Sequence, residues 1–181
     1  MGSVPARWAS AGLTYDRPGA TADDALPAGY NHLDVEAAIG RGPAAFERAV
    51  EGLLTWRMHR GAGLRLVAAS AERAEAGVVV VLRAGPGPLS LPVPCRVVYT
   101  VDDPDRRGFG YGSLPGHPVR GEEAFLVHLD RHGRVHFRLR AFSRPATWVT
   151  RLGGPITTLA QQLAYDRYLA SAHKLTQVHR T

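Results

Sequence analysis

Residues able to carry acid–base chemistry gather in one short stretch, YGSLPGHPVRGEEAF at positions 111–125. It contains a serine, a histidine and two adjacent carboxylates: Ser113, His117, Glu122 and Glu123. Proteins build nucleophiles, general bases and general acids from such groups. The sequence has no G-x-S-x-G turn, the usual support of a nucleophilic serine. The stretch therefore favours proton transfer over serine hydrolysis, with Glu123 and His117 as the candidate catalytic residues.

The role of Glu123 depends on the face of its predicted strand. Because strand side chains alternate, Glu123 shares a face with the apolar Phe125 and Val127, whereas Glu122 points the other way, to solvent. An apolar cavity favours the protonated form of a carboxyl group, which is how general acids are made. The alternative is structural, with Glu123 paired to an arginine or bonded to backbone N–H groups. Similarly, His117 either reaches over a cavity or bonds its own turn.

Two tyrosines on neighbouring predicted strands extend the candidate site. Tyr99 lies on one face of its strand, and Tyr111 and Ser113 share a face of the next. If these faces look inward, two phenols and a hydroxyl join the glutamate among apolar walls that include Phe125. A mostly apolar cavity with a few converging polar groups is the usual form of a small-molecule site. The alternative is that both tyrosines fill the core and bond their hydroxyls to the backbone.

Further candidate ligand contacts lie outside this stretch. Trp56 is on the apolar stripe of a predicted helix, where it could be a platform for a ligand or part of the core. Arg57 and His59 flank it and could supply a counter-charge to the inward glutamate. In the segment SRPA, Ser143 suits a helix cap before a proline-bearing first turn, and Arg144 could contact an anion.

The sequence argues against a metal or a cofactor. Its eight histidines form no H-x-x-x-H pair on a convincing helix face, and alternation places His128 and His136 on the outer face of the predicted sheet. Asp102, Asp103 and Asp105 surround a proline, which is typical of a hairpin turn. No glycine motif has the strand–turn–helix context of a nucleotide site. We therefore expect neither a metal nor a cofactor.

The hydrophobic pattern predicts the elements that position these residues. A first strand is predicted at Leu13–Asp16 and a helix over Pro43–Arg60, where Phe46, Val50 and Leu53 recur at spacings of three or four. Six β-like runs bounded by turn signals follow. They are LRLVAAS (64–70), GVVVVLRAG (77–85), PCRVVYTVD (94–102), RRGFGYGS (106–113), EEAFLVHLD (122–130) and RVHFRLRAF (134–142).

The end of the chain predicts a half-buried strand and a closing helix. Between residues 134 and 142, apolar side chains alternate with histidine and arginine, so one face of the sheet is dry and the other wet. After SRPA, the apolar residues Trp148, Val149 and Leu152 begin a helix that continues to Leu169. A glycine–glycine–proline at 153–155 should kink or divide this helix.

Composition limits the class of protein. A chain of 181 residues is long enough for one core, so we expect a single domain over 1–181, with its core at about 12–174 and flexible ends at 1–11 and 175–181. The lone Cys95 excludes an internal disulfide and fits a reducing compartment. No apolar run reaches membrane-spanning length, and the first residues lack a signal peptide pattern. We expect a cytoplasmic protein without membrane insertion.

The charge of the chain does not predict a nucleic-acid partner. A formal net charge of +6 and a pI near 10.1 would permit contact with polyanions. However, Lys174 is the only lysine among 22 basic residues, and the arginines are scattered among acidic neighbours. This bias is typical of GC-rich, actinobacterial-type coding. A basic adaptor for RNA or anionic lipid would instead require a contiguous arginine face.

Several segments resemble the uncharacterised family called domain of unknown function 1990, which is UPF0548-like. They are LTYDRPGAT, LPAGY, IGRGPAAFERAVEGLLTWRMHRGAGL, PCRVVYTVDDPDRRGFGYGSLPGHPVRGEEAF and AFSRPAT. The likeness runs from Leu13 to Tyr168, and YGSLPGHPVRGEE is its most specific part. The strand order is also similar to that of the START and Bet v 1 superfamily, whose members enclose small hydrophobic ligands. The resemblance implies an α+β helix-grip fold, in which an antiparallel sheet of about six to seven strands wraps around a long C-terminal helix.

Two functions are compatible with this scaffold. The first is a binding protein that holds a small hydrophobic or aromatic molecule between the sheet and the last helix. Its candidate contacts are Trp56, Tyr99, Tyr111, Ser113, Phe125, Ser143 and Arg144. The alternative is an enzyme with cyclase, dehydratase or hydrolase-type chemistry. In that case Glu123 acts as acid or base, and Tyr99, Tyr111 or His117 polarises the substrate.

Overall fold

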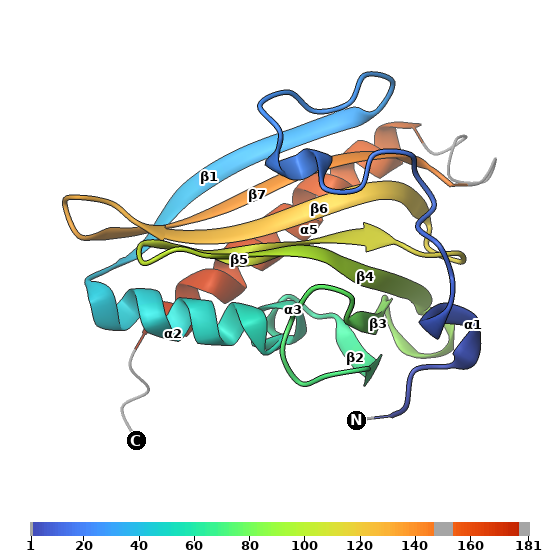
Figure 1. Ribbon diagram of the computed structural model, residues 1–181, viewed down its shortest axis with the longest axis horizontal. Helices are drawn as coiled ribbons and strands as arrows, with labels where there is room; N and C mark the ends of the chain where they lie inside the picture. Colours follow the sequence, from blue (N-terminus) through green and yellow to red (C-terminus); the bar gives the residue numbers. More distant parts are fainter. Residues whose placement is uncertain (1, 147–153, 178–181) are drawn as a thin grey trace.

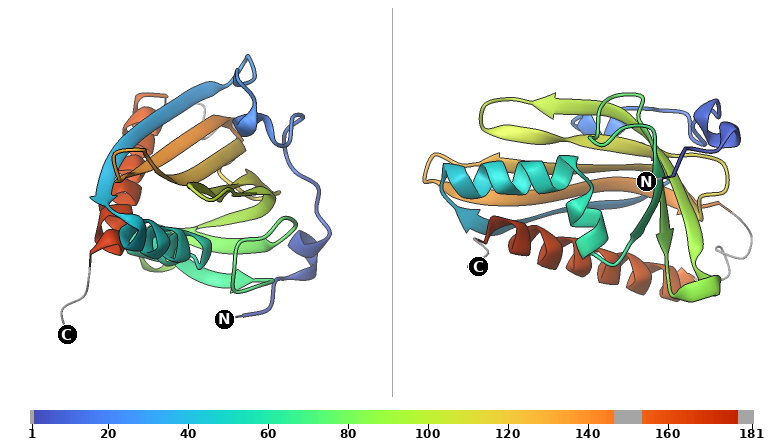
Figure 2. Two further views of the ribbon diagram at one scale, coloured as in Figure 1. Left: turned by 60° about the vertical axis from the view of Figure 1, so that its left-hand side comes forward. Right: turned by 90° about the horizontal axis from the view of Figure 1, so that it is seen from below.

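The computed structural model describes residues 2–146 and 154–177. These residues form a seven-stranded antiparallel sheet that curves around a long C-terminal helix (Figures 1 and 2), as the helix-grip prediction requires. The spatial order is β1-β7-β6-β5-β4-β3-β2, so the last strand joins the first strand to the meander. The bounds are β1 Asn31–Arg41, β2 Arg65–Ala69, β3 Val79–Ala84, β4 Leu91–Asp102, β5 Arg106–Ser113, β6 Val119–Leu129 and β7 Arg134–Pro145.

The two faces of the sheet have different covers, which Figure 2 shows from two sides. Helices α2 (Pro43–Leu54), α3 (Arg57–Gly61) and α5 (Gly154–Thr176) pack on the concave side, here called the inner face. The N-terminal segment, with α1 (Ala6–Ala9) and the 3-10 turn η1 (Ala20–Ala22), crosses the convex outer face. A second 3-10 turn, η2 (Gly87–Leu89), precedes β4. None of the described helices combines the length and apolar character needed to cross a membrane.

The first predicted strand was misplaced. Residues 13–16 form no strand, although the backbone N–H of Thr14 donates to the carbonyl of Ser113 at the end of β5. The first strand is β1, whose sequence NHLDVEAAIGR was not assigned to a strand. Its alternation of Leu33 and Val35 with Asp34 and Glu36 is a half-buried strand pattern. The six β-like runs from residue 64 to 142 are confirmed as β2 to β7.

The predicted helix over Pro43–Arg60 is interrupted at Trp56. Helix α2 ends at Leu54 and α3 begins at Arg57. Trp56 has φ +62°, a left-handed conformation that is uncommon for a bulky side chain. Its indole is 1% exposed within the inner core, so packing fixes this conformation. The carbonyl of Leu54, freed by the break, accepts a hydrogen bond from the backbone N–H of Ala74 at 2.8 Å.

The segment SRPA continues a strand, and the residues that directly follow it lie outside the described part of the chain. Ser143 and Arg144 belong to β7, and the described part of the closing helix begins at Gly154. Pro155 therefore lies in the first turn of α5, where a missing N–H group does not matter. The expected start of this helix, at Trp148, Val149 and Leu152, lies outside the described residues, as does Gly153.

The N-terminal segment builds two small apolar clusters on the outer face. Residues 2–11, which were expected to be flexible, include α1 and the buried Trp8, whose indole N–H donates to the carbonyl of Pro115 at 2.9 Å. Further along, Tyr15 packs edge to face on Phe142 of β7, with ring centroids 5.4 Å apart. A segment distant in sequence thereby shields one end of the sheet from water.

Candidate functional site

A pocket opens between the inner face of the sheet and helix α5. Its volume is about 170 Å³, and we call it the sheet–helix pocket. Strands β1, β6 and β7 supply one wall and α5 the other. The lining residues are Asn31, His32, Leu33, Glu123, Leu139, Ala141, Ser143, Ala164, Tyr165 and Tyr168. The lining combines apolar side chains with polar groups that come from both walls.

Glu123 is the acidic group of this pocket, on the face that strand alternation predicts. It lies opposite Tyr111 in the β5–β6 ladder, and the Tyr111 hydroxyl donates to its Oε2 at 3.0 Å. Burial raises the pKa of Glu123 above its usual range, and the tyrosine bond offsets this only in part. Among the described residues, no cationic side chain pairs with it. The alternative in which an arginine pairs with Glu123 is therefore not met by this part of the chain.

Tyr168 of α5 completes a cluster with Tyr111 and Glu123, which we call the Glu123 cluster. Burial raises the pKa of both hydroxyls, and the nearby Glu123 raises each of them further. Both tyrosines therefore stay protonated at neutral pH and can act only as neutral hydrogen-bonding groups. The sequence placed Tyr168 on the apolar stripe of the closing helix but did not identify it as a site residue. The signal that could have identified Tyr168 is its hydroxyl group, which stands among the apolar side chains of that stripe.

Behind the Glu123 cluster lies a buried histidine with no polar partner. His59 is fully buried, and neither ring nitrogen has a hydrogen-bond partner among the described residues. Burial lowers its pKa to about 3, so the ring is neutral and cannot supply the expected counter-charge to Glu123. Its ring is packed among aromatic rings whose centroids lie 5.0–6.0 Å away. These belong to Trp56, Phe109, Tyr111, Phe125 and Tyr168.

Glu122 is not exposed to solvent, contrary to prediction. Alternation does place it on the outer face, but the N-terminal segment covers it and leaves it 1% exposed. Its carboxylate accepts hydrogen bonds from the Tyr15 hydroxyl at 2.6 Å, the Gly19 N–H at 2.7 Å, and the N–H and hydroxyl of Thr21 at 2.9 and 2.5 Å. Glu122 therefore anchors the N-terminal segment to β6.

Tyr99 lies on the opposite face from Tyr111. A β-bulge between Val97 and Tyr99 shifts the β4–β5 register by one residue, which moves every later side chain to the other face. The Tyr99 hydroxyl consequently meets the Thr21 hydroxyl at 2.8 Å on the outer side. Neither predicted phenol lines the pocket, although Tyr111 hydrogen-bonds to Glu123, which does.

Ser113 and His117 do not line the sheet–helix pocket. The Ser113 hydroxyl lies 2.6 Å from that of Thr14 and accepts the Gly121 N–H at 3.0 Å. His117 accepts the Val119 N–H at Nδ1, so it bonds its own turn, and burial lowers its pKa to about 4. No hydrogen bond among the described residues joins these two side chains to Glu123. The structure does not assemble the possible relay.

The four remaining predicted ligand contacts lie in different places. Trp56 and Phe125 are buried in the inner core, beside His59 and away from the pocket lining. Ser143 does line the pocket, at its β7 wall. Arg144 points its guanidinium over the ring of Tyr30, 4.7 Å from the centroid. Of the seven predicted ligand contacts, Ser143 alone appears in the lining, and Tyr111 reaches it through Glu123.

Replacing Glu123 by glutamine should change the pH dependence of stability in a defined direction. Because folding raises the pKa of Glu123, the folded protein keeps this proton at pH values where the unfolded chain, with a pKa near 4.5, has lost it. The Glu123 contribution therefore lowers the unfolding free energy as pH rises through that window, by up to about 1.4 kcal/mol per pH unit.

The Glu123→Gln variant has no titrating carboxyl group at this position. It should therefore gain stability relative to the wild type as pH rises above the unfolded-state pKa of about 4.5. Urea unfolding at a series of pH values measures the difference. Glu72→Gln, at an exposed position, is the matched control and should show no trend. A wild-type-minus-variant difference that stays constant with pH would contradict the raised pKa.

Comparison with known proteins agrees with the resemblance found in the sequence. Residues 14–171 match the family model described as domain of unknown function (DUF1990). A UPF0548 protein of Deinococcus radiodurans is 42% identical over 140 residues, covering 72% of this chain and 70% of the relative. A UPF0548 protein of Arabidopsis thaliana is 31% identical over 140 residues, covering 73% and 65% respectively. These matches confirm the family resemblance.

Solved structures support the fold at low sequence identity. A hypothetical protein of Helicobacter pylori matches with a TM-score of 0.62 and 8% identity, covering 86% of this chain and 92% of its own. At this identity the likeness concerns the fold alone.

Proposed function

We propose that this chain, which belongs to the DUF1990 family, binds one small, largely apolar molecule in the sheet–helix pocket. The observation that carries the proposal is the carboxyl group of Glu123. It opens on an apolar pocket with Tyr168 beside it, and no cationic partner accompanies it among the described residues. A buried polar group that its own protein leaves under-paired is a natural contact for a ligand.

The pocket volume favours a single-ring ligand. A cavity of about 150 Å³ lined by apolar side chains is large enough for benzene. The sheet–helix pocket, at about 170 Å³, is of that size and below the roughly 300 Å³ at which drug-sized pockets begin. Bulky aromatic side chains fill the rest of the inner core, which restricts the ligand to this end. The expected hydrophobic or aromatic ligand is therefore narrowed to a ring of about six atoms with small substituents.

The polar groups of the pocket favour a neutral ligand with one hydrogen-bonding group. Leu33, Leu139 and Ala141 provide an apolar wall for the ring. Glu123 and Tyr168 can bond a hydroxyl or a similar neutral group. An anionic group is disfavoured, because it would be placed beside a carboxyl group in a poorly solvated pocket.

Binding of p-cresol, toluene and benzoate tests this selectivity. We expect p-cresol to bind in the sheet–helix pocket, and roughly 2- to 12-fold more tightly than toluene, because a hydrogen bond contributes about 0.5–1.5 kcal/mol. Benzoate should not bind measurably. Chemical-shift titration of the full chain gives all three affinities. Equal affinity for the three compounds, or binding of none, would contradict the proposal.

A pair of matched variants on α5 locates the binding. Ala164 lines the pocket, whereas Ala170 is exposed on the same helix outside it. Ala164→Phe should fill the pocket and abolish p-cresol binding, and Ala170→Phe should leave the affinity unchanged. Thermal unfolding of both variants shows whether they remain folded. If Ala164→Phe remains folded and still binds p-cresol, the ligand lies elsewhere.

Acid–base catalysis on the bound molecule is a second candidate function. It is favoured by the Tyr111–Glu123 hydrogen bond and by the raised pKa of Glu123, which together suit a general acid. In this case Glu123→Gln still binds a ring compound, because an amide also offers hydrogen bonds, but it can no longer transfer a proton. Screening single-ring ketones and alcohols for turnover, with wild type and variant compared, distinguishes the two functions.

A further inference from the structure

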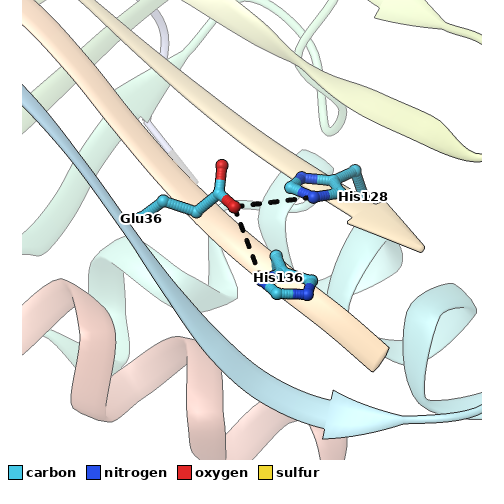
Figure 3. Close-up of side chains that lie close together, drawn as sticks. All are labelled: Glu36, His128 and His136. Carbon is cyan, nitrogen blue, oxygen red and sulfur yellow. Dashed lines mark ion pairs between the residues drawn. The ribbon is translucent and has the colours of Figure 1, made fainter. Parts of the chain in front are cut away.

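Three potential metal ligands converge on the outer face of the sheet, on the side opposite the sheet–helix pocket. Glu36 of β1, His128 of β6 and His136 of β7 come from three adjacent strands, as Figure 3 shows. Oε1 of Glu36 lies 3.4 Å from Nδ1 of His136 and 3.7 Å from Nε2 of His128. All three ligand atoms lie within 4.8 Å of one another.

Strand register brings these side chains together. His128 and His136 are direct partners in the β6–β7 ladder, and their rings stack with centroids 4.7 Å apart and 4° between planes. On β1, Ala38 is the partner of His136, so Glu36 is the diagonal neighbour on the same face. Rigid backbone pairing therefore positions all three groups without a loop. The sequence predicted the outer position of both histidines but could not reveal that β1 adds a carboxylate.

A fourth residue, Asp130, orients His136. Its Oδ1 accepts the backbone N–H groups of His132 and Arg134, and its Oδ2 accepts the Arg134 side chain. Nε2 of His136 lies 3.3 Å from Oδ2 of Asp130, so Asp130 contacts the ring nitrogen that faces away from Glu36. A carboxylate on the far nitrogen is the usual support of a metal-binding histidine.

This arrangement brings three donor atoms close together. Nδ1 of His136 and Nε2 of His128 both lie near Oε1 of Glu36. Two imidazole nitrogens and a carboxylate oxygen are ligand types that Zn²⁺ binds in proteins.

We propose that Glu36, His128 and His136 bind one divalent transition-metal ion, with Zn²⁺ as the test ion, and that Asp130 positions His136. A donor set of two imidazoles and one carboxylate suits Zn²⁺, Cu²⁺ or Ni²⁺ rather than Mg²⁺ or Ca²⁺. In tetrahedral geometry a metal–ligand distance of about 2.1 Å places ligand atoms roughly 3.4 Å apart, so the two stacked imidazole rings must rotate toward a common point to complete the site.

The surroundings of this site tolerate a cation. Arg138 is held in a two-point ion pair with Asp34 at 2.7 Å, and Arg134 pairs with Asp130. The arginine charges nearest the ligands are thus partly compensated. Three protein ligands leave a coordination position open to water on the exposed outer face. The site belongs to the open class of metal sites rather than the closed structural class.

Titration of ZnCl2 into the full chain tests the proposal. Calorimetry should give one saturable site, and the ring-proton NMR signals of His128 and His136 should shift with the same saturation. His128→Ala, His136→Ala and Glu36→Gln should each weaken the affinity by more than the roughly 10- to 100-fold typical of a lost supporting residue. Asp130→Asn should fall within that range.

His132→Ala is the matched control, because His132 lies in the same hairpin but outside the ligand set. It should keep wild-type affinity, and thermal unfolding without metal identifies any variant that fails to fold. The proposal is overturned if ZnCl2 gives no saturable binding. It is also overturned if the control loses as much affinity as folded ligand variants. The first result would mean that the contacts of His136 with Glu36 and Asp130 serve only to stabilise the sheet.

Discussion

Acidification should destabilise this protein steeply, and replacing His59 by phenylalanine should remove much of that effect. Folding lowers the pKa of His59 from 6.5 to about 3, because the ring is buried without a polar partner. Between these values the unfolded chain binds a proton that the folded protein does not. The contribution of His59 to the unfolding free energy is therefore fully present above pH 6.5. It is lost as pH falls from 6.5 toward 3, by about 1.4 kcal/mol per pH unit.

Urea unfolding of the wild type and His59→Phe over a range of acidic pH measures this slope. The variant should be less sensitive to acid, and at neutral pH at least as stable, since it removes two unsatisfied nitrogens from an aromatic cage. His117, whose pKa is lowered to about 4, keeps a smaller acid dependence of the same sign. His132→Ala, at an exposed position, should behave like the wild type. Equal slopes for wild type and His59→Phe would contradict the buried neutral state.

Removing the carboxylate of Glu122 should cost roughly 3–5 kcal/mol of unfolding free energy. Glu122→Ala leaves the donors of Tyr15, Gly19 and Thr21 without their acceptor beneath the N-terminal segment. Each unsatisfied buried donor costs about 1–3 kcal/mol unless water reaches it. Glu72→Ala, at an exposed position, should change the free energy by less than about 0.5 kcal/mol.

Hydrogen exchange shows where this loss occurs. The amides of Gly19 and Thr21 donate to Glu122 in the wild type and should exchange much faster in Glu122→Ala. Amides in the centre of β6 and β7 should keep most of their protection. A loss of stability below about 1 kcal/mol, with Gly19 and Thr21 still protected, would show that Glu122 is not the anchor of this segment.

The sequence predicted the architecture better than the surroundings of individual side chains. Hydrophobic period and turn signals located six of the seven strands and the closing helix, because local patterns encode them. Strand β1 carries an equally clear alternation, but the first strand is predicted at Leu13–Asp16 instead. The break at Trp56 could not be predicted, since burial of one indole against distant residues stabilises its left-handed backbone.

Errors at the site have long-range causes. Alternation gave the correct faces of Glu122 and Glu123, but it could not show that a segment a hundred positions away covers Glu122. A single bulge in β4 turned Tyr99 away from the pocket. His59 was expected to be a flanking cation and is a neutral core residue instead. Tyr168, which lines the pocket together with Glu123, belongs to the C-terminal helix and is distant from Glu123 in the sequence.

The most direct test of the account is the position of bound p-cresol. Intermolecular nuclear Overhauser effects from its ring protons should reach the methyl groups of Leu139 and Ala141, and the carboxyl carbon signal of Glu123 should shift on binding. Contacts to methyl groups of the outer face would contradict the account. So would an unshifted Glu123 carboxyl that titrates near 4.5 with p-cresol bound.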